Sequence, residues 1–193
     1  MKTSTHRLVF CGIMVGLGSA LSVIHIVKMP LGGSITPLSM LPLVLISICF
    51  GIKWGLVSSF AYSVIQLVFG LSVDGLLGWG LSGPQLAGCI VLDYFAAYTA
   101  LGLAGIFGRK KPLAPVYGTA LAMLLRFSIH ILSGVIIFSH LGQKFELFNK
   151  LILGKPLLYS VCYNGFFMLP ETIFTCVAVY ILIKIRFFEK TSL

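Results

Sequence analysis

The chain has 193 residues, of which 58% are hydrophobic and only 10% are charged, whereas a soluble domain carries about 25% charged residues. Together with a mean hydropathy of +1.04, this excludes an ordinary soluble domain and predicts a chain that contacts lipid over most of its area. The formal charge of +9 lies mainly in short gaps between apolar runs. We therefore interpret it as a determinant of membrane orientation and expect no nucleic-acid partner.

Six apolar runs have lengths close to that of a membrane-spanning helix, which needs about 20 residues. No soluble domain, internal repeat or low-complexity tract is evident between them. The first run is long and has no A-x-A-like cleavage site, so we expect it to stay in the mature fold. We predict an all-α membrane protein, one domain over residues 1–193, with helices at 8–28, 36–52, 54–72, 83–107, 114–140 and 156–187.

Basic residues between the runs predict the orientation of this bundle. If both termini are cytoplasmic, nine Lys and Arg residues fall on the inner side and four on the outer side, as the positive-inside bias favours. We therefore expect a multi-pass protein of the cell membrane. Trp54 and Trp79 fall near the predicted interfaces, where indole rings favour a half-wet position. The inner residues are Lys2, Arg7, Lys53, Arg109, Lys110, Lys111, Lys184, Arg186 and Lys190, and the outer ones are Lys28, Lys144, Lys150 and Lys155.

The sequence carries no recognisable catalytic or metal-binding motif. The five cysteines are odd in number, lie in apolar runs and have no CxxC spacing. We find no H-E-x-x-H, G-x-S-x-G or phosphate-binding loop. We therefore expect neither an enzyme nor a bound cofactor or metal. Any active transport by this chain would take its energy from a partner or an ion gradient.

Three charged residues lie well inside the apolar runs: Asp93, Arg126 and Glu171. One such residue at the centre of a spanning helix costs roughly 2.5 to 3.5 kcal/mol, so each must face the bundle interior, a wet cavity or another of the three. Arg126 and His130 are four residues apart and share one helix face. Asn164 and Glu171, seven apart, share a face of the last helix.

The polar groups of three helices fall at similar depths. At 1.5 Å per residue, Asp93 and His130 lie roughly 15 Å from the outer ends of their helices, with Asn164 at roughly 12 Å and Arg126 at roughly 21 Å. A structural ion pair between Asp93 and Arg126 is one interpretation. A ligand cavity open to the outside is the other, and it also accounts for the imidazole, the carboxamide and two phenols. Candidate stacking partners for its ligand are Phe138, Tyr163 and Phe166.

The first helix carries Gly12, Gly16 and Ala20 at a spacing of four residues. Small residues at this interval allow a second helix to approach closely. The stripe therefore indicates either a docking face for a partner membrane protein or packing inside this bundle.

Four stretches together resemble a known family, the ThiT (YuaJ) family. Its members are thiamine-specific substrate-binding subunits, or S-components, of energy-coupling factor transporters. The resemblance spans Leu8 to about Arg186. The four stretches are MPLGGSITPLSMLP (29–42), VLDYFAAYTALGLAGIFGR (91–109), LLRFSIHILSGVIIFS (124–139) and YSVCYNGFFMLPETI (159–173).

The resemblance implies a six-helix S-component with cytoplasmic termini and a thiamine pocket near the outer face, capped by the first loop. It implies partnership with a shared membrane subunit and two ATPases, with the small-residue stripe of the first helix as the docking face. A self-sufficient, proton-coupled secondary transporter for thiamine or a related vitamin remains the alternative. The implied thiamine-binding residues are Asp93, Tyr94, Arg126, His130, Tyr159 and Asn164.

The chain departs from the family pattern at several positions. Some members have Glu in place of Asp93, Lys in place of Arg126 and Trp in place of Phe138, and a tryptophan that some carry in the first loop is absent here. These differences bear on pocket size and stacking. They leave thiamine, its phosphates and its pyrimidine precursor open as ligands.

Overall fold

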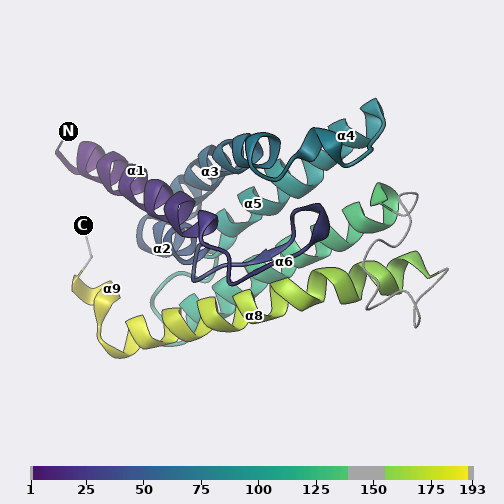
Figure 1. The fold of residues 1–193 in the computed structure, drawn as a ribbon. Helices are drawn as coiled ribbons and strands as arrows, with labels where there is room; N and C mark the ends of the chain where they lie inside the picture. Colours follow the sequence, from purple (N-terminus) through teal and green to yellow (C-terminus); the bar gives the residue numbers. More distant parts are fainter. Residues whose placement is uncertain (1, 139–154, 191–193) are drawn as a thin grey trace.

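The computed structural model describes residues 2–138 and 155–190, and it confirms an all-α bundle (Figure 1). In the described part of the chain, five helices are long and apolar enough to cross a membrane. The final two residues expected in the fifth helix, 139 and 140, lie outside the described residues. The five are α1 (Lys2–Val23), α3 (Ile52–Ser72), the composite helix Gly83–Leu103, α6 (Ala114–Ile136) and α8 (Pro156–Lys184).

The segment between the first two helices differs from the prediction. α1 ends at Val23 rather than at residue 28, and α2 begins at Leu41 rather than at residue 36. Residues 23–27 are mostly β-branched, which favours extended backbone, and a proline at position 37 disfavours helical backbone at the residue before it. Residues 24–40, here called the first loop, instead contain a hairpin. Its strands β1 (Val27–Lys28) and β2 (Ser34–Ile35) are antiparallel and flank the 3-10 turn η1 (Pro30–Gly32).

The second helix is a short core helix rather than the expected span over residues 36–52. α2 (Leu41–Phe50) has ten residues, and every residue from Pro42 to Cys49 is buried. Apolar side chains on the longer helices behave differently: Val57, Leu124 and Ile173 are all more than half exposed. Exposed apolar side chains of this size on spanning helices are expected where helices face lipid, which fits a multi-pass membrane protein.

The composite helix changes its winding where it reaches the bundle interior. Regular helix α4 (Gly83–Cys89) passes into a π-helical stretch, η3 (Ile90–Ala96), then into α5 (Ala97–Thr99) and the 3-10 turn η4 (Ala100–Leu103). The π-helical stretch contains Asp93 and Tyr94. Such wide turns inside helices occur frequently at functional sites.

The chain termini and the connection between α3 and α4 lie at opposite ends of the bundle. Figure 1 shows both chain termini at one end, where the short helix α9 (Phe187–Lys190) follows α8. The short turn η2 (Leu76–Gly78) joins α3 to α4 at the opposite end. The first loop crosses α6 beside α8 (Figure 1), and strand β2 contacts α8. The loop thus covers the bundle interior from one side.

Candidate ligand-binding site

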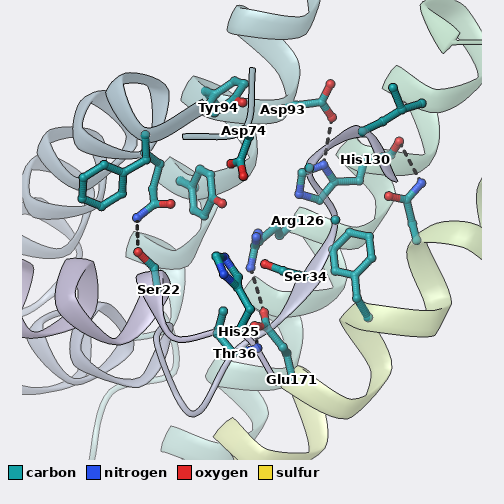
Figure 2. A pocket seen from close by; sticks show the side chains of 18 of the residues that line it. Ser22, His25, Ser34, Thr36, Asp74, Asp93, Tyr94, Arg126, His130 and Glu171 are labelled. Atoms are coloured by element: carbon teal, nitrogen blue, oxygen red, sulfur yellow. Dashed lines mark hydrogen bonds and ion pairs between the residues drawn. The ribbon is translucent and has the colours of Figure 1, made fainter. Parts of the chain in front are cut away.

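A cavity of about 130 Å³ lies between the first loop and helices α3, η3, α6 and α8. This space is on the order of ten times what a single water needs, so the cavity has room for a small organic molecule. All six residues predicted as thiamine contacts line it, and Figure 2 shows four of them with labels. They are Asp93, Tyr94, Arg126, His130, Tyr159 and Asn164.

One wall of the cavity is built around the carboxylate of Asp93. Its Oδ1 lies 2.8 Å from Nδ1 of His130, and its Oδ2 accepts a hydrogen bond of 2.5 Å from the hydroxyl of Ser133 (Figure 2 shows the first contact). The other ring nitrogen of His130, Nε2, is buried and has no hydrogen-bond partner among the described residues. Nε2 is therefore the ring nitrogen that a ligand group can reach with a hydrogen bond.

The base of the cavity holds a second charged group. Nη1 of Arg126 lies 3.4 Å from Oε2 of Glu171, and each side chain is only 4% exposed. The guanidinium carbon of Arg126 lies 4.5 Å from the ring centre of Tyr98, a cation–π contact. Glu171 also accepts hydrogen bonds from the backbone N–H (3.0 Å) and the hydroxyl (2.5 Å) of Thr36 in the first loop. The arginine is thus neutralised and fixed from two sides.

A structural ion pair between Asp93 and Arg126, one of the two interpretations of the sequence, is wrong. Asp93 contacts His130, one helical turn beyond Arg126 on α6, and Arg126 contacts Glu171. The π-helical stretch that carries Asp93 alters the direction of its side chain relative to a regular helix, which spacing along the sequence does not reveal. Glu171 lies on α8, which packs along α6 and brings this carboxylate to Arg126.

A hydrogen-bonded junction joins α8 to α6 beside the cavity. The side-chain amide of Asn164 donates to the backbone carbonyl of His130 at 3.3 Å, and the hydroxyl of Ser160 donates to the carbonyl of Ile131 at 2.9 Å. Asn164 donates as well to the carbonyl of Ser160 at 2.9 Å. These bonds occupy the amide N–H groups of Asn164, so its carbonyl oxygen is the group left for a ligand.

The aromatic residues of the cavity match the prediction in part. Phe138 and Tyr163 line the cavity, but Phe166 does not and is 42% exposed. Its neighbour Phe167 lines the cavity instead. The two residues differ by 100° around the helix, so an error of one position moves a ring from the interior to the lipid-facing side.

Several lining residues were not predicted from the sequence. Asp74 follows α3, lies 2.8 Å from the ammonium of Lys28 in the first loop, and accepts a hydrogen bond of 3.1 Å from the indole N–H of Trp79 at its backbone carbonyl. The tryptophan, expected only as an interface anchor, also packs 6.1 Å from Phe138 between ring centres. The chain has only five acidic residues. The rarity of an acid such as Asp74 was the sequence feature that could have marked it as a residue of the site.

The first loop forms one wall of the cavity. Leu31, Gly32 and Gly33 line it, and the hydroxyl of Tyr163 on α8 donates a hydrogen bond to the carbonyl of Pro30. Gly32 has φ +87°, and a Cβ there would lie 2.7 Å from the Trp79 ring. Only glycine therefore lets the loop pass this close to the tryptophan.

The charges of the lining favour a cation. Three carboxylates face the cavity region, those of Asp74, Asp93 and Glu171, against the single guanidinium of Arg126 and two histidines. Arg126 is paired with Glu171, and Asp74 with Lys28 of the first loop, so the carboxylate of Asp93 is the one without a Lys or Arg partner among the described residues, and it gives the cavity a negative balance. Aromatic faces beside them add further attraction for positive charge.

The small-residue stripe of α1 lies on an open face. Gly12, Gly16 and Ala20 are exposed, and a Cβ built on either glycine meets nothing within 4 Å. Packing inside this bundle, one of the two interpretations of the stripe, is therefore wrong for these residues in the described structure.

The described chain is thus a lipid-exposed helical bundle that encloses a polar cavity, as expected for a multi-pass membrane protein. The profile of the thiamine transporter protein family (Thia_YuaJ) matches residues 8–189, and the chain belongs to this family of transporters rather than enzymes. It is 27% identical over 191 residues to thiamine transporter ThiT of Bacillus subtilis (strain 168), covering 91% of this chain and 89% of that protein.

A solved structure of ThiT from Listeria monocytogenes has the same fold. The TM-score is 0.71, with 18% sequence identity, 94% of this chain and 95% of that chain covered. At this level of identity the likeness bears on the fold alone. The family and the fold expected from the four sequence stretches are thus both confirmed.

Proposed function

We propose that this chain captures thiamine in the cavity and serves as the S-component of an energy-coupling factor importer. The observation that carries the proposal is the convergence of Asp93, His130 and Asn164 from three helices on one buried, negatively balanced cavity. Thiamine presents a cationic thiazolium ring and an aminopyrimidine with hydrogen-bonding edges. Both halves have partners of matching chemistry in this cavity.

Six of the lining residues have a defined role in this proposal. Asp93 offers its carboxylate to a ligand amine or cation, His130 offers Nε2, and Asn164 offers its carbonyl oxygen. The rings of Phe138 and Tyr163 offer faces for the two aromatic halves. Arg126 is a positioning residue at the base, since its guanidinium is already held by Glu171.

The binding step is tested by calorimetry with the purified chain in detergent. We expect saturable thiamine binding that is lost or reduced by more than about tenfold in Asp93→Asn, because the negative charge is lost and one acceptor oxygen is replaced by an amide donor. Ser133→Ala leaves the charge and removes only the support of Asp93, so its loss is smaller. Ser128→Ala is the matched control, because that hydroxyl bonds to the carbonyl of Leu124 in its own helix. Absence of thiamine binding by the wild type contradicts the proposal.

The partner face in this proposal is the open stripe of Gly12, Gly16 and Ala20 on α1. A large side chain there would block a second helix without disturbing this bundle, since the space beside both glycines is empty. We expect Gly16→Leu to keep thiamine binding and to lose uptake in cells that contain the shared membrane subunit and its ATPases. Uptake at the wild-type level would remove this face from the proposal.

The proposed S-component also has a defined orientation in the membrane. With both termini in the cytoplasm, the end of the bundle that carries the cavity faces outward, as the basic-residue bias also favours. Cysteine labelling of a variant with a single cysteine at Ser192, in intact and opened cells, tests this. Labelling from outside would reverse the orientation.

A self-sufficient proton-coupled transporter is the second candidate, favoured by one observation. The ionisable pair of Asp93 and His130 lies inside the bundle, where such groups frequently mark proton relays. Uptake in cells that lack every energy-coupling module separates the candidates. Concentrative uptake by this chain alone, abolished by an uncoupler, would replace the S-component proposal, whereas no uptake supports it.

A further inference from the structure

A second hollow lies at the end of the bundle that carries the termini, away from the thiamine cavity. It is lined by residues 107–114 together with Tyr117 and Phe188, and we call it the basic groove. Arg109, Lys110 and Lys111 follow one another along its rim. None of the proposed thiamine contacts lines it, so it needs an explanation of its own.

The positive charge of the basic groove is not neutralised by ion pairs seen in the structure. Lys110 and Lys111 are exposed, and no ion pair joins either of them to Asp74, Asp93 or Glu171, the acids whose side chains the structure describes. Arg109 donates from Nη1 to the backbone carbonyl of Phe188 at 3.2 Å, which holds the groove wall in place without removing the charge. α6 also begins here, after Leu113, and no side chain caps that end. The positive end of the α6 helix dipole adds partial positive charge.

The floor of the basic groove is apolar and open. Phe107 is 54% exposed, Tyr117 61% and Leu113 41%. These side chains continue an exposed apolar surface, since Ile106, just beyond the end of the composite helix at Leu103, is 47% exposed. A soluble anion would gain nothing from this floor, but a molecule with a charged head and apolar tails would contact both parts.

We propose that the basic groove binds an anionic phospholipid. Its phosphate lies against Arg109, Lys110 and Lys111, and an acyl chain lies along Phe107 and Tyr117. Basic pockets at the ends of spanning helices are a common basis for recognition of anionic headgroups. The charge-assisted hydrogen bonds of three adjacent cations, together with apolar contact for the tail, distinguish this lipid from a zwitterionic one.

Native mass spectrometry of the purified chain tests the proposal. Phosphatidylglycerol and phosphatidylcholine with the same acyl chains are titrated into wild type and two double variants. Lys110→Gln with Lys111→Gln removes two groove lysines, and Lys53→Gln with Lys184→Gln removes two exposed lysines elsewhere. We expect the wild type and the second variant to prefer phosphatidylglycerol, and the first variant to bind it about tenfold more weakly. Unchanged thermal unfolding shows that both variants are folded.

Three outcomes would overturn the proposal. One is equal binding of the two lipids by the wild type. Another is an equal loss in both double variants, which would reflect total charge rather than the groove. The third is displacement of phosphatidylglycerol by inorganic phosphate at the same concentration, which would assign the groove to a free anion.

Discussion

Thr36 and Glu171 are 135 residues apart in the sequence and meet through two hydrogen bonds, from the backbone N–H at 3.0 Å and from the hydroxyl at 2.5 Å. The same carboxylate pairs with Arg126 on α6. Glu171 thus connects the first loop to the two helices that form the base of the cavity. Burial makes each of these contacts costly to remove.

Removing the Thr36 hydroxyl should loosen the first loop. We expect Thr36→Val to lower the free energy of unfolding by about 1 to 3 kcal/mol, because a buried hydrogen bond to a charged group is lost. Thermal unfolding in detergent measures the effect. Thr172→Val is the control, since its hydroxyl bonds to the carbonyl of Met168 one turn earlier in α8. Equal falls in the unfolding temperature of the two variants would show that the bond between Thr36 and Glu171 adds no stability.

The aromatic wall should distinguish two phenylalanines of similar chemistry. Phe138 lines the cavity, whereas Phe166 is 42% exposed and does not. We expect Phe138→Ala to weaken thiamine binding by about threefold to tenfold, from the loss of an aromatic contact. Phe166→Ala should leave the affinity unchanged. Calorimetry on both variants decides, and a loss confined to Phe166→Ala would contradict the geometry described here.

Gly70 on α3 determines where the ring of Tyr94 sits. A Cβ at this position would overlap the Tyr94 hydroxyl, so Gly70→Ala must displace the ring into the cavity or away from it. We expect a drop in thiamine affinity with a measurable fall in the unfolding temperature, as overpacked sites show. Gly16→Ala is the matched control, because a Cβ there meets nothing within 4 Å. Wild-type affinity in Gly70→Ala would exclude a role for the Tyr94 position.

The charge of the cavity predicts an order among related ligands. Glu171 and Asp74 have basic partners, Arg126 and Lys28, whereas Asp93 has no Lys or Arg partner in the described part of the chain, and its carboxylate disfavours added negative charge on the ligand. We expect thiamine to bind more tightly than its monophosphate, and the monophosphate more tightly than the diphosphate. The neutral pyrimidine precursor lacks the cation and should bind more weakly than thiamine. Competition calorimetry ranks the four, and a preference for the diphosphate would contradict the electrostatic argument.

The sequence predicts where a side chain lies when contact of that side chain with lipid would cost much free energy. Asp93, Arg126 and Glu171 had to face the interior, because lipid would not tolerate them. All three line one cavity, together with His130 and Asn164. The starts of α6 and α8 were likewise visible from apolar runs that follow charged loops.

Contacts across the bundle were harder to predict. The partner of Arg126 depends on a π-helical stretch and on the packing of α8 against α6, neither of which leaves a local pattern. Trp79 and Asp74 join the cavity because the segment after α3 folds back toward it. The sequence pointed to Phe166 rather than Phe167 at the cavity because α8 is apolar around its whole circumference. Residue spacing on such a helix does not show which side faces the interior.

The short second helix has a consequence for how such a protein diversifies. α2 is fully packed within the protein over Pro42–Cys49, and the chain length that a full membrane crossing would have used forms the first loop instead. The backbone there is held by a short hairpin and a few side-chain bonds rather than by a helical ladder. Substitutions at cavity-lining positions of this loop, such as Leu31 and Ser34, therefore change what the cavity admits while leaving the lipid-facing helices untouched. Selection for a new nutrient has a separate region of the chain on which to act.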